Sequence, residues 1–86
     1  MSSYRVNLVS SAEKELQRLP EREIARIVPR LEQLASLPRP PGCKKLKGGD
    51  KEWRIRVGSY RIVYTIDDET KAIDVTRIAH RRDVYR

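Results

Sequence analysis

The chain has few of the residues that build disulfides, metal sites and aromatic cores. Its 86 residues include one cysteine, one histidine, one tryptophan and no phenylalanine. Cys43 has no second cysteine to pair with, so an internal disulfide is excluded, and one thiol with one imidazole does not make a zinc signature. No Cys–His pairing that would activate Cys43 lies near it in the sequence. The core is therefore expected to be mainly aliphatic, and any chemistry has to come from other side chains.

Long apolar runs are also missing, while positive charge is in excess. No run approaches the length of a membrane span, and the first residues, MSSYR, carry no apolar signal segment, so we expect a cytoplasmic protein without membrane contact. Lys and Arg number 19 against 12 Asp and Glu, a net charge of +7. Residues 44–86 hold 12 of these cations and 7 of the acids. This excess favours a polyanionic partner: nucleic acid, an anionic membrane or an acidic protein.

Residues 53–64, WRIRVGSYRIVY, predict a β-hairpin that turns at Gly58-Ser59. Strand alternation places the aromatic and aliphatic side chains on one face, and Arg54, Arg56 and Arg61 on the other. Three guanidiniums on one surface predict an anion site, most simply for a phosphate backbone. An exposed basic face without a ligand is the alternative.

The remaining pattern predicts a single α+β domain over residues 1–86 with a mostly antiparallel sheet. A strand is expected at residues 4–9, and a short helix after a capping box formed by Ser10 and Glu13. An apolar stripe from Ile24 to Ala35 predicts a second helix, bent at Pro29, that forms a hairpin with the first. Residues 37–42, rich in proline, form a connector. A basic loop with a short strand near Leu46 follows, and residues 72–79 form the last strand.

The side chains that remain for chemistry suit RNA cleavage without a metal. RNA supplies its own nucleophile, the 2′-OH, and the enzyme has to stabilise the charge on the pentavalent phosphorane. Preorganised guanidiniums can do this, and a single donor can contribute about 3 kcal/mol. His80 or Tyr85 could exchange the protons. The strand and tail residues available for such a site are Arg54, Arg56, Arg61, Arg77, His80, Arg81, Arg82 and Tyr85.

The hairpin sequence and the chain end together resemble the RelE branch of the RelE/ParE toxin superfamily. The resemblance rests on the stretch from Trp53 to Tyr64, the Leu19-Pro20 joint, the Lys45-Leu46-Lys47-Gly48 step and the terminal His80-Arg81-Arg82-Asp83-Val84-Tyr85. It covers essentially the whole chain. It implies a β-α-α-β-β-β microbial ribonuclease-like fold with a helix hairpin packed on the sheet.

The same resemblance implies a function and partners. RelE-type toxins enter the A site of the 70S ribosome and cut the mRNA there by 2′-OH attack, without metal or cofactor. A cognate antitoxin, RelB-like, acidic and partly disordered, holds them inactive. By position, Arg54 and Arg56 match the basic pair of the family, and Arg61 matches the arginine on the scissile phosphate. Arg81 matches the arginine near the leaving group, and Tyr85 the tyrosine that stacks on or orients the substrate.

The chain departs from this pattern where many members carry lysines. Arg54 and Arg56 occupy those positions, and arginine is a poor base at neutral pH. His80 could take the role of the base. The alternatives are substrate-assisted or electrostatically driven attack, with His80 an exposed or hydrogen-bonded residue at the end of the strand. Arg61 and Arg81 are expected to be surface residues. Further RNA contacts are predicted for Lys44, Lys45, Lys47, Lys51, Arg77 and Arg82. Two other functions remain open: a ParE-like inhibitor of DNA gyrase, and an RNA- or ribosome-binding module without activity.

Overall fold

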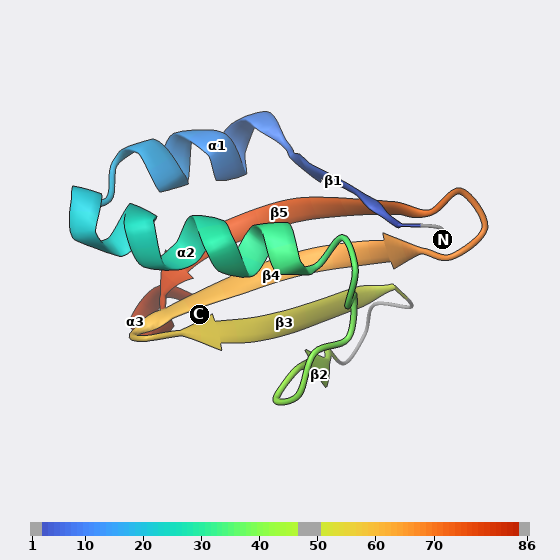
Figure 1. The fold of residues 1–86 in the computed structure, drawn as a ribbon. Helices are drawn as coiled ribbons and strands as arrows, with labels where there is room; N and C mark the ends of the chain where they lie inside the picture. Colours follow the sequence, from blue (N-terminus) through green and yellow to red (C-terminus); the bar gives the residue numbers. More distant parts are fainter. Residues whose placement is uncertain (1–2, 47–50, 85–86) are drawn as a thin grey trace.

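A five-stranded mixed sheet carries two helices on one face in the computed structural model, which describes residues 3–46 and 51–84 (Figure 1). The strand order is β1-β5-β4-β3-β2; β1 runs parallel to β5 and the other neighbours are antiparallel. The predicted α+β class is confirmed, and no described helix is long and apolar enough to cross a membrane. The elements in chain order are β1 (Arg5–Leu8), α1 (Ser10–Gln17), α2 (Glu21–Gln33), β2 (Lys44–Lys45), β3 (Glu52–Val57), β4 (Tyr60–Asp67), β5 (Ala72–His80) and α3 (Arg81–Val84).

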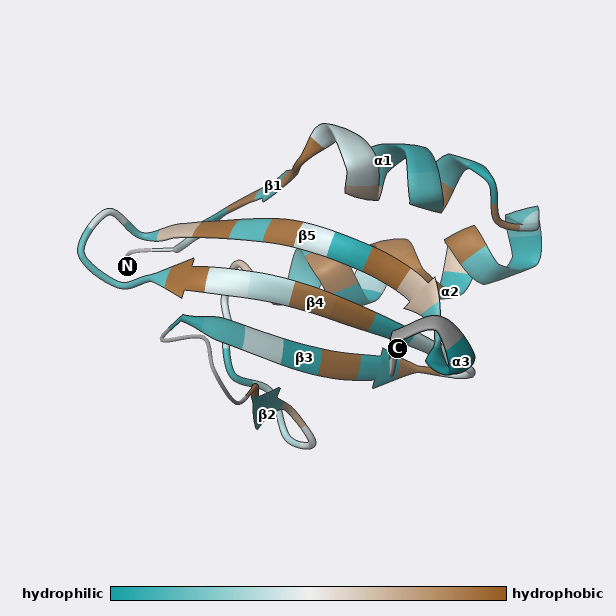
Figure 2. Ribbon diagram, turned by 180° about the vertical axis from the view of Figure 1, so that it is seen from behind, coloured by the Kyte–Doolittle hydropathy of each residue, from teal (hydrophilic) through white to brown (hydrophobic). Residues whose placement is uncertain are grey.

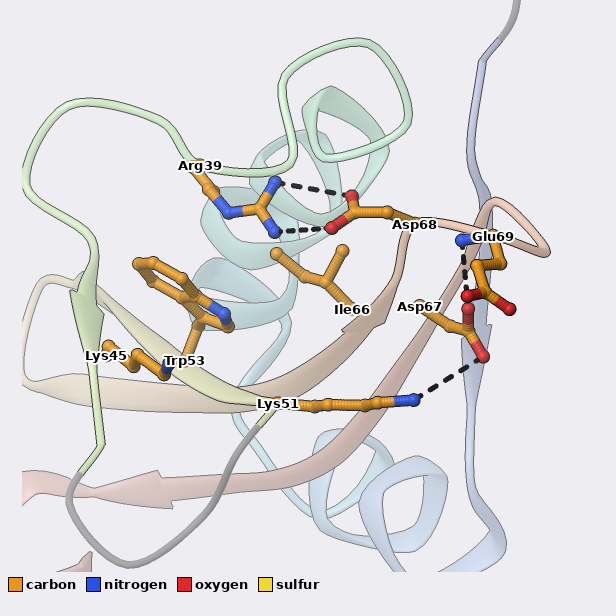
Figure 3. Close-up of a pocket in the computed structure, with 8 residues that line it drawn as sticks. All are labelled: Arg39, Lys45, Lys51, Trp53, Ile66, Asp67, Asp68 and Glu69. Atoms are coloured by element: carbon orange, nitrogen blue, oxygen red, sulfur yellow. Dashed lines mark hydrogen bonds and ion pairs between the residues drawn. The ribbon is translucent and has the colours of Figure 1, made fainter.

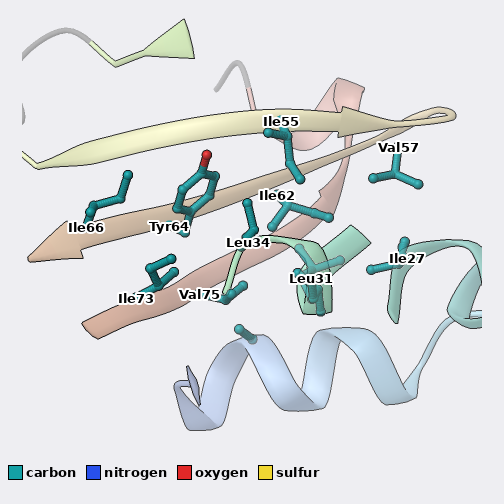
Figure 4. Close-up of a cluster of buried hydrophobic side chains, with 12 residues drawn as sticks. Ile27, Leu31, Leu34, Ile55, Val57, Ile62, Tyr64, Ile66, Ile73 and Val75 are labelled. Atoms are coloured by element: carbon teal, nitrogen blue, oxygen red, sulfur yellow. The ribbon is translucent and has the colours of Figure 1, made fainter. Parts of the chain in front are cut away.

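The core lies between α2 and the sheet, and it is aliphatic as predicted. Ile27 and Leu31 of α2 pack with Leu34 onto the inward side chains of β3, β4 and β5 (Figure 4). Tyr64 is the largest fully buried side chain, and its hydroxyl donates a hydrogen bond to the Pro38 carbonyl at 2.8 Å. Burial raises the pKa of the Tyr64 phenol well above its usual value. The tyrosine therefore fastens the connector after α2 to the centre of the sheet.

The β3–β4 hairpin has the predicted two-residue turn. Gly58 adopts φ +61°, the left-handed region that a glycine at the first position of a tight hairpin turn allows. The turn fixes the register, so that Arg56 lies opposite Arg61 and Ile55 opposite Ile62. A Cβ built on Gly58 would lie 3.0 Å from the Arg26 guanidinium, so α2 also reaches this turn.

The β5 edge is protected by a side chain where its neighbouring strand ends. β1 pairs with β5 only as far as Val75. Beyond it, the Ile78 N–H donates to the Glu15 carboxylate of α1 at 2.8 Å, and the Arg77 guanidinium lies 3.6 Å from the same carboxylate. A carboxylate thus takes the place of a strand partner, which limits pairing of this edge with another chain.

Candidate functional site

Strand pairing gathers arginines on the sheet face opposite α2, here called the arginine face: Arg54 and Arg56 of β3 with Arg61 of β4. Ile55 and Ile62 are buried on the face that α2 covers. Because side chains alternate along a strand, the arginines lie on the other face. Arg56 and Arg61 are direct cross-strand partners. Like charges in this arrangement destabilise a sheet. Two guanidiniums at one place could bind the same anion from two neighbouring strands.

Arg61 is buried, and the expectation of a surface side chain is wrong. Only 3% of the residue is exposed, because β4 lies inside the sheet with β3 and β5 on either side. The burial includes the guanidinium itself, because its Nε and Nη1 atoms have almost no surface exposed to solvent. A guanidinium held in such a place interacts more strongly with a nearby anion than one in free solvent.

The short helix α3 brings Arg81 to the same end of the sheet. The Arg81 N–H donates a hydrogen bond to the Ser59 carbonyl at 2.8 Å, so α3 begins beside the β3–β4 turn. Seen from behind, α3 lies next to this turn on the side of the sheet that α2 does not cover (Figure 2). Arg81 and Arg82 are both exposed there. Tyr85 and Lys47, predicted as site residues, lie outside the described residues.

His80 is not brought together with the arginines. It lies on β5 directly opposite Tyr60 of β4, and the two rings meet edge to face with their centroids 5.5 Å apart. Tyr60 packs against the core, so His80 lies on the α2 side of the sheet while Arg61 lies on the other. Alternation along the strand is the reason, because His80 and the Arg61 partner Ala79 are adjacent in sequence.

The bonding of His80 also limits the role as base that the sequence suggested. Its Nδ1 accepts a hydrogen bond from the Arg82 N–H at 3.3 Å, which makes His80 the N-cap residue of α3. With its Nδ1 engaged in this bond, the ring leaves only Nε2 for contact with a ligand. Sequence reasoning missed this role because the start of α3 was not predicted.

The other predicted RNA contacts differ in their surroundings. Arg77 is held by Glu15 of α1, and the Lys51 ammonium lies 3.8 Å from the Asp67 carboxylate. Arg82 is exposed on α3. Lys44 pairs with Arg54 across β2 and β3 and so lies on the arginine face. Lys45, the next residue, pairs with Trp53 and belongs to a different pocket.

That pocket, of about 420 Å³, is balanced in charge (Figure 3). The Arg39 guanidinium lies over the Trp53 ring and binds both carboxylate oxygens of Asp68, the shorter contact being 2.9 Å. The hydrogen bond from Arg39 lowers the pKa of Asp68, and a backbone N–H bond from Thr70 lowers that of Asp67. The lining residues are Arg39, Lys45, Lys51, Trp53, Ile66, Asp67, Asp68 and Glu69. Three cations thus face three carboxylates.

A second pocket, of about 300 Å³, is lined by cations without acids. It is formed by Arg30, Pro41, Gly42, Lys44, Arg54, Ile55 and Arg56. Arg30 comes from α2 and was not among the predicted site residues. Its helical pattern marks it only as part of a polar face, and no local signal indicates that this face meets the edge of β3.

Comparison with known proteins agrees with this architecture. The family model described as ParE toxin of type II toxin-antitoxin system, parDE, matches residues 6–85. Toxin RelG of Mycobacterium tuberculosis is 32% identical over 84 residues, covering 96% of this chain and 97% of that protein. In a crystal structure of the archaeal RelE-RelB complex from Pyrococcus horikoshii OT3, the matching chain superimposes with a TM-score of 0.82 at 29% identity, covering 94% of this chain and 97% of that one.

A second solved complex gives the same result. In the toxin-antitoxin complex RelBE2 from Mycobacterium tuberculosis, the matching chain has a TM-score of 0.79 at 30% identity and covers 91% of this chain and 98% of that chain. The family model spans nearly all of this sequence, and these relatives share both its length and its fold. This chain therefore belongs to the RelE/ParE family of toxins from type II toxin–antitoxin systems.

Proposed function

We propose that this toxin is a ribosome-dependent endoribonuclease that cleaves mRNA in the A site by attack of a 2′-OH on the adjacent phosphate. The observation that carries the proposal is the cross-strand pair of Arg56 and Arg61, with Arg81 held at the same end of the sheet by its bond to Ser59. A phosphate in this place would meet positive charge from two strands and from α3. The RelE and RelG names of the relatives support the same assignment.

Each arginine has a distinct part in the proposed reaction. Arg61, buried and held between two strands, binds the scissile phosphate, and Arg56 stabilises the charge that grows on its oxygens. Arg81 lies near the leaving 5′-oxygen. Guanidiniums stay protonated at neutral pH, so they stabilise charge but accept no proton. We therefore assign the attack to the substrate itself. The 2′-OH loses its proton to a phosphate oxygen or to water as the bond from O2′ to phosphorus forms, and the bond from phosphorus to the 5′-oxygen breaks as that oxygen receives a proton from the same phosphate or from water.

We also propose an antitoxin as the partner that restrains this activity in the cytoplasm. The solved relatives from Pyrococcus horikoshii and Mycobacterium tuberculosis are complexes of a toxin with its antitoxin. The net charge of +7 favours an acidic, RelB-like partner, whose association should slow as salt is raised. Arginines exposed for a phosphate would equally attract carboxylates, so one surface can serve both substrate and inhibitor.

Primer extension on translated mRNA tests the proposal. Wild type should give cuts inside the A-site codon, and Arg81→Ala should reduce the single-turnover rate by about 100-fold, the effect of removing one charge-stabilising donor. Arg22→Ala, an exposed arginine of α2 that lines neither pocket, is the matched control and should cleave normally. Arg61→Ala is a poorer test, since truncating a buried side chain can also lower stability.

The alternatives have their own signatures in the same assays. Intact mRNA with double-strand DNA breaks in growing cells would identify a ParE-like gyrase inhibitor instead. Ribosome binding without cuts would leave a binding module. Unchanged cleavage by Arg81→Ala at an unchanged melting temperature would remove Arg81 from the catalytic set.

A further inference from the structure

The cationic pocket at the edge of β3 is built from parts of the chain far apart in sequence. α2 contributes Arg30, the connector contributes Pro41 and Gly42, β2 contributes Lys44, and β3 contributes Arg54, Ile55 and Arg56. β2 pairs with β3 only at Arg54 and Trp53, so the edge of β3 from Ile55 onward has no strand partner among the described residues. The pocket lies at this open edge and can be entered by a chain that passes over the arginine face.

Its charge is not neutralised within the described part of the chain. Among the side chains that the structure describes in residues 3–46 and 51–82, no carboxylate forms an ion pair within 4 Å with Arg30, Lys44, Arg54 or Arg56. The pocket beside Trp53 has three cations, and two of them, Arg39 and Lys51, form ion pairs with acids of the lining (Figure 3). Four like charges around one hollow repel one another, and an anion inside it relieves that repulsion. The contrast marks the pocket at β3 as the one prepared for a ligand.

We propose that this pocket is a second phosphate subsite, which holds a backbone phosphate of single-stranded RNA next to the nucleotide that is cut. The inference rests on the proposed function and adds Arg30 and Lys44 to it. Arg56 connects the two places, because it lines the pocket and also lies opposite Arg61. Arg54 and Arg56 are two residues apart on one strand, about 7 Å along it. A phosphodiester chain can bring one anion to Arg61 and the next to the pocket.

The lining favours a phosphate chain over an acidic protein segment. Only Pro41 and Ile55 contribute apolar side chains larger than glycine, so an anchoring residue of a peptide would find little apolar surface. The guanidinium forks of Arg30, Arg54 and Arg56 match the oxygens of a phosphate in a bidentate manner. Gly42 adopts φ +90° and contributes no side chain to the lining, and no heavy atom lies within 4 Å of where its Cβ would stand.

Binding of a non-cleavable RNA tests the subsite apart from catalysis. We would measure the affinity of a 2′-O-methyl RNA oligonucleotide by fluorescence anisotropy between 50 and 300 mM salt, for wild type, Arg30→Gln and Lys44→Gln. Each variant should weaken binding three- to tenfold at the lowest salt. Each should also flatten the slope of log affinity against log salt by about 0.7, the value for one lost contact with a single strand. Lys44 is exposed on β2, so Lys44→Gln keeps the test valid if Arg30→Gln lowers the melting temperature.

Arg22→Gln is the matched control, because it removes the same charge from the same helix away from the pocket. An equal loss in Arg22→Gln would show a general charge effect and overturn the subsite. A loss of affinity for a polyglutamate peptide with unchanged RNA binding would assign the pocket to an acidic protein and also overturn it. Failure of the proposed function is a separate result, since wild type would then leave ribosomal mRNA uncut whatever Arg30→Gln does to RNA binding.

Discussion

His80→Ala removes the side-chain acceptor at the N-terminus of α3, and the consequence for activity can be worked out from the structure. The helix has four residues, too few to be stable without support from its ends and its packing. The bond from the Arg82 N–H to Nδ1 is a capping bond, and removing such a cap costs about 1 kcal/mol. That energy lowers the ratio of formed to unformed α3 about fivefold. Because α3 carries Arg81, cleavage should fall by at most this factor, which is reached only when the unformed state of α3 is the more populated one.

His80→Asn separates capping from proton transfer. Asparagine is among the best N-cap residues, so it restores an acceptor for the Arg82 N–H, but it cannot act as a base at neutral pH. Both variants lose the ring contact with Tyr60, so that contact does not distinguish them. We expect His80→Asn to cleave at nearly the wild-type rate and His80→Ala to cleave more slowly, by a factor of at most about five. A general base would instead cost about 100- to 10,000-fold in both variants.

Single-turnover cleavage on programmed ribosomes gives the rates, and hydrogen exchange at residues 81–84 reports the helix directly. Faster exchange in His80→Ala with near-normal exchange in His80→Asn is the pattern that capping requires. Equal exchange and equal rates in the two variants would refute the capping argument. A loss of 100-fold or more in His80→Asn would restore the base role suggested by the sequence.

Two further predictions concern stability. Tyr64→Phe should lower the free energy of unfolding by about 1 to 2 kcal/mol in urea titrations, because the Pro38 carbonyl loses the donor 2.8 Å away; an unchanged midpoint would contradict this. Hydrogen bonds from Arg39 and the Tyr4 hydroxyl lower the pKa of Asp68, so its contribution to stability is present above its unfolded pKa of about 3.9 and is lost as pH falls through the lower folded value. Between pH 5 and pH 2 the melting temperature of Asp68→Asn should therefore fall less than that of wild type, and parallel curves would count against the argument.

Period-two patterning is the part of the fold that the sequence reveals most directly. Each strand residue has only two faces to choose from, so the alternation of residues 53–64 predicts both the hairpin and its arginine face. The apolar stripe along α2, which follows the period of 3.6 residues of a helix, likewise predicts the buried residues of α2. The helix continues through Pro29 as expected. The capping box at Ser10 was wrong: Ser10 is already helical, Val9 is the N-cap residue, and its carbonyl accepts the Glu13 N–H.

The site was less predictable than the fold. The features of the site that the sequence did not indicate depend on how the helices and strands pack in three dimensions. Arg61 is buried since β4 lies inside the sheet, and strand order is not written in the local pattern. His80 and Ala79 differ by one position, and that one step decides which face of the sheet each residue occupies. Arg30 becomes a pocket residue only when α2 crosses the edge of β3.

The β3–β4 turn has more influence on the site than its two small residues suggest. A slip of one residue in this hairpin would move Arg61 to the α2 face and break its pairing with Arg56. The two-residue loop with Gly58 at φ +61° fixes the register against such a slip. The next residue, Ser59, accepts the bond that starts α3 with Arg81. This one turn thus fixes the positions of arginines on β3, β4 and α3. Backbone pairing therefore determines how the arginines are arranged, whatever rotamers their side chains adopt.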